Sequence, residues 1–466
     1  MRKPSTLTLV VMSALLLGGC ASFSKDGGFD AIESATRTHI QKDVVWTRDD
    51  ATRQRVQERV DALLEKTLSA DDAVQIALLN NPGLQAALNT LGIAEADWVA
   101  AQRLPNPGFS IGRSTRGSEV EWERSLHFNL ARLLTMPMRA DIEQRLFEQT
   151  RRNLTLEVLR LASDTRKAWY TAVAAAESAQ VQREAMEAAE AGAELARRMA
   201  EVGNWSKLKQ AREQSFYADT ALAVARSEQA KTQTRERLVR LLGLADTAKV
   251  KLPSRLPDLP ANLPLLPEIE QQAMDSRLDL QMVKLETEAL AKNLELTRST
   301  RFINVLELGI SNNTSNEEPT QRGYEISFEL PLFDWGQSRV VAAESRYRQM
   351  LERARATAIN ARSEVREAHA MAQSQYAVAR HVRDEVLPLK KRISEENVLR
   401  YNGMLIGVFE LLADARSQLA AVNIAIESSR DFWLAEADLQ MALIGTPGKT
   451  LVTNTAAAPS DADGGH

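Results

Sequence analysis

The sequence predicts a mixed fold of two similar halves, in which each half joins a β-hairpin to very long helices. Three observations support this prediction. Short motifs recur in the same order about 200 residues apart, long proline-free stretches are rich in Ala, Glu, Arg, Gln and Leu, and two regions alternate between apolar and polar residues. Aromatic residues make up only 5% of the chain and charged residues 26%, which is typical of extended helices packed side by side.

The internal repeat consists of four pairs of similar segments in the same order. Residues 77–84 resemble 273–280, residues 126–130 resemble 326–330, residues 211–214 resemble 415–418, and residues 241–243 resemble 443–445. One such pair can arise by chance, whereas four pairs in register indicate a duplication.

The predicted domain boundaries follow from the repeat and from composition. The first repeat covers residues 69–250 with a hairpin at about 108–131, and the second covers residues 269–446 with a hairpin at about 304–332. The prolines of residues 251–268 predict a stiff, extended crossing between the two repeats. Residues 447–466, rich in Ala, Ser, Asp and Gly, are expected to form a disordered tail.

The N-terminus has the features of a secretory signal peptide over residues 1–19. A basic pair precedes an apolar run at residues 7–17, which is too short to span a bilayer permanently. The run ends in Leu-Gly-Gly-Cys, a pattern that resembles a bacterial lipobox, and Cys20 is the only cysteine. We expect Cys20 to carry acyl chains that anchor the segment 20–68. A plain signal peptide followed by an incidental cysteine is the alternative. Alanine at position 21 implies, by resemblance to the bacterial sorting rule, delivery to the outer membrane.

The helical pattern predicts a helix pair before each hairpin and a very long helix after it. The expected helices include residues 69–80, 83–103, 138–202 and 338–401. Pro82 interrupts the first pair. At 1.5 Å per residue the first long helix would span about 100 Å. Gly203 and Gly403 are expected to end the two long helices, and small alanines between the apolar positions suit coiled-coil-like packing.

The alternating segments predict two hairpins with polar connections at residues 113–123 and 312–322. If these strands lie in a membrane, an open sheet edge cannot face lipid, and four strands are too few to close even the smallest known barrel of about eight. Several subunits must then share one barrel. Three copies supply twelve strands; two copies would also close, with little bore. Glu307, Glu325 and Glu329 would line a wet lumen. A pair of soluble hairpins packed on one face is the alternative.

Residues 331–339, Pro-Leu-Phe-Asp-Trp-Gly-Gln-Ser-Arg, directly follow a predicted strand and resemble the strand-to-helix signature of the TolC family of outer-membrane efflux proteins. Residues 77–84 and 104–107 fit the same family, and the resemblance covers about residues 69–445. Pro331 would end the strand because it cannot donate to the ladder. Asp334 can cap the helix that follows, and Gly336 permits an abrupt turn. The first half has a degenerate Met-Pro-Met at residues 136–138 in the same place.

The resemblance implies a TolC-like homotrimer with a 12-stranded transmembrane β-barrel, four strands per subunit, continued by a long periplasmic α-helical barrel. It also implies a lipid-anchored, membrane-spanning protein of the cell outer membrane. Such a protein is the passive export duct of a tripartite efflux system, with a periplasmic adaptor (membrane fusion) protein and an inner-membrane pump of the resistance-nodulation-division type. Its cargo would be toxic compounds, either heavy-metal cations such as copper or silver, or drugs. The tips at Gly203 and Gly403 would contact the adaptor.

The family's gate lies where the long helices turn at the periplasmic end. Counted from Tyr401 at the turn, Glu410 aligns with the first of the family's two acidic ring positions. The second position falls on the residue before Asp414, and Arg400 is the nearest substitute for the family's arginine. Three symmetry-related Glu410 carboxylates would attract cations. An exposed glutamate on an ordinary helix surface is the alternative.

Other function classes have little support in the sequence. The net charge of −4 and the lack of a basic stripe with aromatics argue against nucleic acid as a partner. The five histidines are scattered without metal-ligand spacing, and there is no phosphate loop or nucleophile elbow. We therefore expect no enzymatic activity, metal site or cofactor. The competing class is a lipid-anchored periplasmic coiled-coil scaffold without a channel, which would have no use for hairpins with one apolar face.

Overall fold

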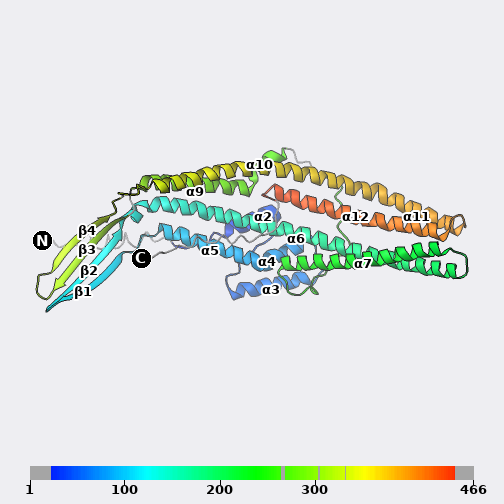
Figure 1. The fold of residues 1–466 in the computed structure, drawn as a ribbon, viewed down its shortest axis with the longest axis horizontal. Helices are drawn as coiled ribbons and strands as arrows, with labels where there is room; N and C mark the ends of the chain where they lie inside the picture. Colours follow the sequence, from blue (N-terminus) through cyan, green and yellow to red (C-terminus); the bar gives the residue numbers. More distant parts are fainter. Residues whose placement is uncertain (1–21, 264–267, 303–304, 331, 447–466) are drawn as a thin grey trace.

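The computed structural model describes residues 22–263, 268–302, 305–330 and 332–446. Cys20, Pro331, the signal peptide and the tail at 447–466 lie outside these ranges. The described chain is elongated. A small sheet lies at one end, and the turns from α6 to α7 and from α11 to α12 lie at the other (Figure 1). No helix among the described residues combines the length and the apolar composition that membrane crossing requires.

The same order of elements occurs twice. After α2 (Asp30–Ile40) and α3 (Asp50–Leu64), the first half contains α4 (Ala70–Asn80), α5 (Pro82–Gln102), β1 (Gly108–Arg116), β2 (Glu119–Asn129), α6 (Leu130–Glu201) and α7 (Lys207–Leu242). The second half contains α8 (Ile269–Ser276), α9 (Leu278–Thr300), β3 (Leu306–Ser315), β4 (Gln321–Phe328), α10 (Gln337–His381), the π-helix η1 (Val382–Val386), α11 (Leu387–Asn402) and α12 (Val408–Ala442).

The break between α4 and α5 packs on the end of α7. Asn81 caps α5, because its side chain accepts a hydrogen bond from the Leu84 N–H at 3.0 Å, and Pro82 occupies the first turn. The side-chain amides of Asn80 and Asn81 donate to carbonyls of the last α7 residues, including that of Leu242 at 3.0 Å. The Asn-Asn-Pro sequence therefore both divides the helix pair and satisfies carbonyls that the end of α7 leaves free.

In the second half, Arg277 takes the place of Asn81. Its side chain is only 1% exposed and donates to the Ala442 carbonyl at the end of α12 over 3.0 Å. It also pairs with the carboxylates of Asp279 at 2.6 Å and Glu364 at 2.7 Å. The similar segments 77–84 and 273–280 thus make equivalent contacts with the end of the returning helix in their own halves.

The four strands form one antiparallel sheet in the order β1-β2-β3-β4. The predicted polar connections are too long, because strand pairing extends through most of them. Pairing of β1 with β2 continues to Arg116 and Glu119 around Gly117, whose φ is +63°. Backbone groups make the hydrogen bonds between strands, so polar side chains can occupy both faces of a strand. The predicted connections at 113–123 and 312–322 therefore wrongly include polar residues of the strands.

The first long helix begins eight residues before the predicted start. The side chain of Asn129 accepts from the Arg132 N–H at 2.7 Å, so α6 starts directly after β2 and Pro137 lies inside it. The interpretation of residues 136–138 as the junction is therefore wrong, since the helix cap lies seven residues before Met136.

The second long helix is not a single regular α-helix. Pro388 has no N–H to donate, and the Leu387 N–H instead reaches back five residues to the Val382 carbonyl, which forms η1. At the tips, Gly203 has a φ of +77°, but in the second half the left-handed residue is Met404 with a φ of +57°. Gly403 has a φ of −79° and occupies the C-cap position of α11, so it lies at the end of that helix, as expected, without adopting the left-handed conformation of Gly203.

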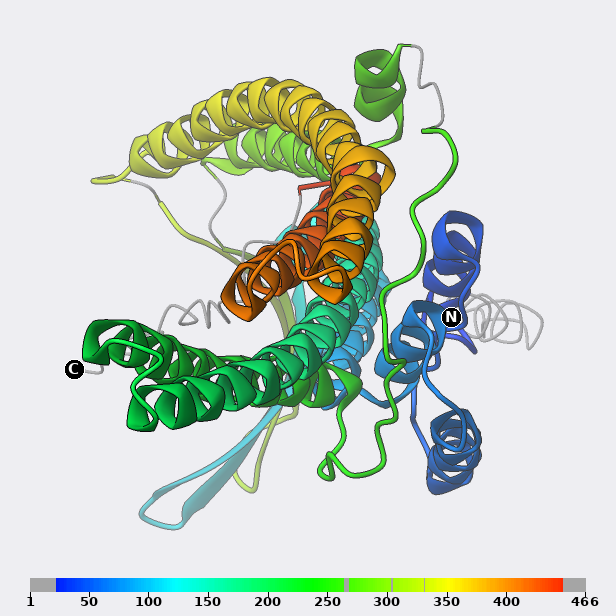
Figure 2. The same ribbon diagram turned by 90° about the vertical axis from the view of Figure 1, so that its right-hand side faces the viewer.

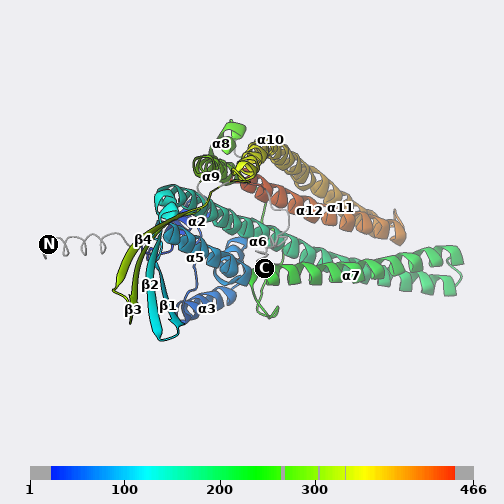
Figure 3. The ribbon, with the colours of Figure 1, turned by 60° about the vertical axis from the view of Figure 1, so that its left-hand side comes forward.

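Viewed along the long axis, the long helices form an arc, with α2, α3 and the crossing segment on its convex side (Figure 2). Side chains of α10 and α12 hydrogen-bond to the crossing segment. The Trp433 indole N–H donates to the Pro257 carbonyl at 3.2 Å, and the Tyr376 hydroxyl donates to the Ala261 carbonyl at 2.8 Å. Figure 3 shows the sheet at the ends of α5, α6, α9 and α10 that lie away from the tips.

Candidate functional site

In the part of the sheet nearest the helices, one face is apolar. Phe109 lies opposite Leu126, Leu126 opposite Ile310, and Ile310 opposite Tyr324. The next rows toward the helices hold Phe128, Leu308 and Ile326, and then Leu306 and Phe328. Tyr324 is 82% exposed and Ile326 56% exposed, so these side chains lie uncovered by the described chain. A contiguous exposed apolar face of this kind marks a surface that contacts lipid or another protein.

The opposite face of the sheet carries small and polar side chains. One row contains Gly108, His127, Gly309 and Glu325, and the row closer to the helices contains Glu307 opposite Ser327. Two of the three predicted lumen carboxylates, Glu307 and Glu325, therefore lie on this polar face. Glu329 follows the end of β4. A polar face backed by an apolar one is the pattern of a wall between water and lipid.

The strand-to-helix junction places Gly336 in the left-handed region, with a φ of +71°. A Cβ at this position would lie 2.5 Å from the Arg301 carbonyl oxygen, so the approach requires glycine. Asp334 accepts from the Gly336 N–H at 2.8 Å and from the Ser338 hydroxyl at 3.2 Å. It therefore holds the turn before α10, while Gly336 itself occupies the N-cap position without a side-chain cap.

Large apolar side chains surround this junction. Phe333 is fully exposed and Trp335 is 62% exposed, and the Trp335 ring meets Phe302 edge-to-face. Aromatic residues gather in this way at the interface between a membrane and water.

The four predicted gate residues lie near the second tip but do not form a cluster. Glu410 lies exposed in the first turn of α12, and Arg400 pairs along its own helix with Glu396 at 3.8 Å. Tyr401 lies near the end of α11. Asp414 has one carboxylate oxygen that is buried without a hydrogen-bond partner. Within the described part of the chain, no hydrogen bond or ion pair joins any two of these four residues.

The two tips also contact each other through residues that no sequence pattern singled out as contacts. Arg416 on α12 pairs with Glu213 on α7, and its guanidinium lies 3.8 Å from the centroid of the Phe216 ring. The Trp205 ring contacts Phe409. Glu213 and Arg416 lie in the segments 211–214 and 415–418, which the repeat matches with each other.

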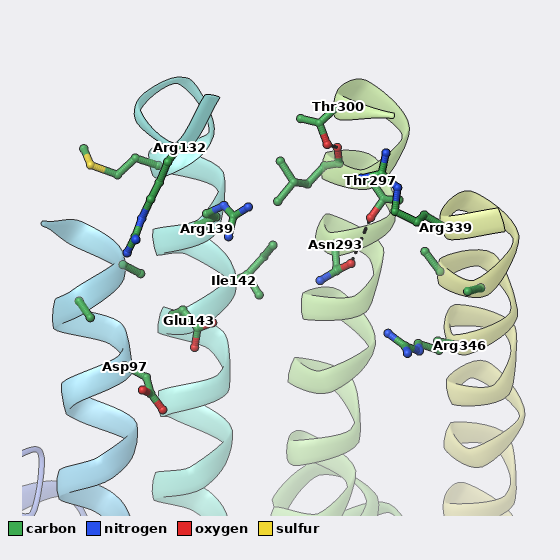
Figure 4. Close-up of a pocket in the computed structure, with 16 residues that line it drawn as sticks. Asp97, Arg132, Arg139, Ile142, Glu143, Asn293, Thr297, Thr300, Arg339 and Arg346 are labelled. Carbon is green, nitrogen blue, oxygen red and sulfur yellow. Dashed lines mark hydrogen bonds between the residues drawn. The ribbon is translucent and has the colours of Figure 1, made fainter. Parts of the chain in front are cut away.

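A cavity of about 650 Å³ lies between the helices just beyond the sheet. Figure 4 shows its lining from α5, α6, α9 and α10, with four arginines, Arg132, Arg139, Arg339 and Arg346, and two carboxylates, Asp97 and Glu143. Burial, together with the charge of Asp97, raises the pKa of Glu143. Within the described ranges, no group of three or more His, Cys, Asp or Glu side chains is placed to hold a metal ion.

Residues 269–391 match the family model described as outer membrane efflux protein. This match lies within the predicted second repeat and confirms the resemblance to that family, whose members are transport ducts rather than enzymes. No curated protein matches the chain.

Solved structures share the fold at low sequence identity. CusC, described with transmembrane channel formation, is 18% identical with a TM-score of 0.63, over 81% of this chain and 92% of that chain. The Campylobacter jejuni CmeC outer membrane channel is 17% identical with a TM-score of 0.64, over 84% and 85%. The open state of the Neisseria gonorrhoeae MtrE outer membrane channel is 18% identical with a TM-score of 0.65, over 84% and 91%. The predicted fold class is confirmed.

Proposed function

We propose that this chain, which has the fold of outer-membrane channels and matches the outer membrane efflux protein family over residues 269–391, forms the outer-membrane channel of a tripartite efflux system. The observation that carries the proposal is the four-stranded sheet with one apolar and one polar face. That sheet continues into α6, whose 72 residues span about 110 Å.

The sheet has two unpaired edge strands, β1 and β4, and the need to pair them determines how the subunits assemble. In lipid the unpaired N–H and C=O groups of an edge strand each cost several kcal/mol, so both edges must be paired. Pairing β4 of one subunit with β1 of the next closes a barrel of twelve strands when three subunits take part. The apolar rows then face lipid, and Glu307 and Glu325 face the lumen with Glu329 near its rim.

Lipid anchoring at Cys20 fits the position of the first described residues. The Arg103 guanidinium lies 5.7 Å from the Phe23 ring, at the end of α5 where the chain enters β1. The Ser24 N–H donates to the Glu95 carboxylate at 2.7 Å. Three residues span at most about 11 Å, so acyl chains on Cys20 would enter the bilayer at the level where the sheet begins.

An efflux channel of this kind would have protein partners and a transported cargo. The turns near Gly203 and Gly403 would meet a periplasmic adaptor protein, which links the duct to an inner-membrane pump. A passive duct carries what the pump selects, so the proposed cargo is toxic compounds, either metal cations such as copper or silver, or drugs.

Purification from outer membranes in mild detergent tests this function. We expect a particle with the mass of three 51.7 kDa chains, less their signal peptides, that dissociates on SDS gels only after heating. It should form discrete conductance steps in planar bilayers. A Cys20→Ser protein that is monomeric and soluble without detergent, and that forms no conductance steps, would instead support the scaffold.

Glu410→Ala tests the proposed gate. Three carboxylates at a constriction concentrate cations, and a cleft lined by one sign of charge does so by about tenfold or more. We expect block of the channel by Mg²⁺ added on the periplasmic side to weaken on the order of tenfold. Glu190→Ala, which removes an exposed carboxylate from α6, is the matched control and should leave the block unchanged. Equal Mg²⁺ block of the wild type, Glu410→Ala and Glu190→Ala would show that Glu410 does not line the pore.

A further inference from the structure

The cavity between α6 and α9 gathers positive charge. Figure 4 shows Arg139 directed into the gap from α6, and Arg339 and Arg346 directed toward α9 from α10. Arg132 lies at the same end, whereas Asp97 and Glu143 lie toward α5. Each subunit thus places four guanidinium groups against two carboxylates.

Several other arginines on the helices pair with a carboxylate of a neighbouring helix. Arg145 pairs with Glu288, Arg183 with Glu228, and Arg298 with Glu344. In the described ranges, by contrast, Arg132, Arg139 and Arg346 make no ion pair with a carboxylate within 4.0 Å. Because four guanidinium groups outnumber two carboxylates in the lining, the cavity has an excess of positive charge, which attracts anions.

The cavity faces the concave side of the arc. On α6, Leu159 packs toward Ile40 of α2, which lies on the convex side (Figure 2). Arg139 precedes Leu159 by 20 residues, which at about 100° per residue places the two side chains on opposite faces of α6. In the proposed trimer the concave side is the lumen, so three such cavities would encircle the duct where the helices meet the barrel.

We propose that Arg132, Arg139, Arg339 and Arg346 form an oxyanion site in the lumen that binds the phosphate, sulfate or carboxylate group of a passing anionic solute. The planar guanidinium fork matches these groups and can bind them with two parallel hydrogen bonds. Asn293, Thr297 and Thr300 of α9 line the same cavity and supply neutral donors. This inference rests on the proposed channel, and it makes anionic compounds the cargo class that the upper duct favours.

The raised pKa of Glu143 acts in the same direction, because a more readily protonated carboxyl opposes the arginines less. The duct would then carry two charge bands in series. The acidic tip at Glu410 attracts cations, and the basic belt beside the sheet retains anions and slows free metal cations.

Arg139→Gln combined with Arg346→Gln tests the site in planar bilayers of pure phosphatidylcholine. The control combines Arg53→Gln and Arg55→Gln, which remove the same charge from exposed positions on α3, on the convex side. From reversal potentials in a KCl gradient, we expect the wild-type ratio of anion to cation permeability to exceed that of the double variant by at least about twofold. Inorganic phosphate should reduce the conductance of the wild type and the control but not that of the double variant.

Equal reversal potentials and equal phosphate block of conducting wild-type and variant channels would overturn the site and leave the proposed channel intact. Failure of all three proteins to conduct would contradict the channel itself. If the proteins differ only after phosphatidylglycerol is added to the bilayer, the arginines bind a lipid headgroup, and the lumen site is overturned. Heat-modifiable trimers of the variant establish that it folds.

Discussion

Arg277→Ala is expected to lower the free energy of unfolding by about 3–5 kcal/mol per subunit. The guanidinium is fully buried and joins three elements, because it pairs with Asp279 and Glu364 and donates to the Ala442 carbonyl. Removing it leaves the carboxylate of Asp279 buried without its partner, and an uncompensated buried charge is what makes such changes severe. Chemical unfolding in detergent, followed by circular dichroism, measures the effect.

Arg383→Ala is the matched control for this change. Arg383 also pairs with a neighbouring aspartate, Asp384, but its side chain is 42% exposed, so its loss should cost no more than about 1 kcal/mol. A similar small loss for Arg277→Ala would show that the cluster does not hold α9 to α12.

The pH dependence of this cluster has a defined sign. Burial opposes ionisation of Asp279, but hydrogen bonding and charge from Arg277 outweigh it and lower the pKa of Asp279. Its contribution to stability is therefore present above the ordinary aspartate pKa of about 3.9 and is lost as the pH falls through the lower pKa of the folded protein. The stability difference between wild type and Arg277→Ala should shrink in that acidic range.

Local sequence patterns predicted the helices and strands well where one face of an element is consistently apolar. Alternation at Tyr324, Ile326 and Phe328 identified β4, and Pro82 marked the boundary of α5. The patterns failed where polar residues continue a strand, as from Arg113 to Arg116, because backbone pairing rather than side-chain burial holds that part of the sheet.

The contacts between distant segments could not be predicted from such patterns. The pairing of Arg416 with Glu213 depends on α7 and α12 both packing on α6, which neither helix encodes alone. The basic cavity depends on α6 lying beside α9. One signal was available, since the repeat offset of 200 residues relates Arg139 to Arg339, and both side chains line that cavity.

Lipid contact by the apolar face predicts that Ile326→Lys prevents assembly of the trimer in the outer membrane. Ile326 lies in the middle of the apolar rows, beside Leu308, and is exposed in the subunit. A lysine on the lipid face of a barrel costs up to about 2–4 kcal/mol, depending on its depth in the bilayer, and a trimer carries three of them. We expect the heat-modifiable trimer to be lost from outer-membrane fractions on unheated SDS gels.

Ser327→Lys is the control that separates lipid exposure from strand disruption. Ser327 is the next residue of the same strand and faces the other side of the sheet, opposite Glu307. A lysine there would enter a water-filled lumen beside a carboxylate, so the trimer should persist in near-normal amount. Consecutive residues of β4 point to opposite faces of the sheet. Comparison of the two variants therefore shows which face contacts lipid. Loss of the trimer in both, or in Ser327→Lys alone, would contradict the proposed orientation of the sheet.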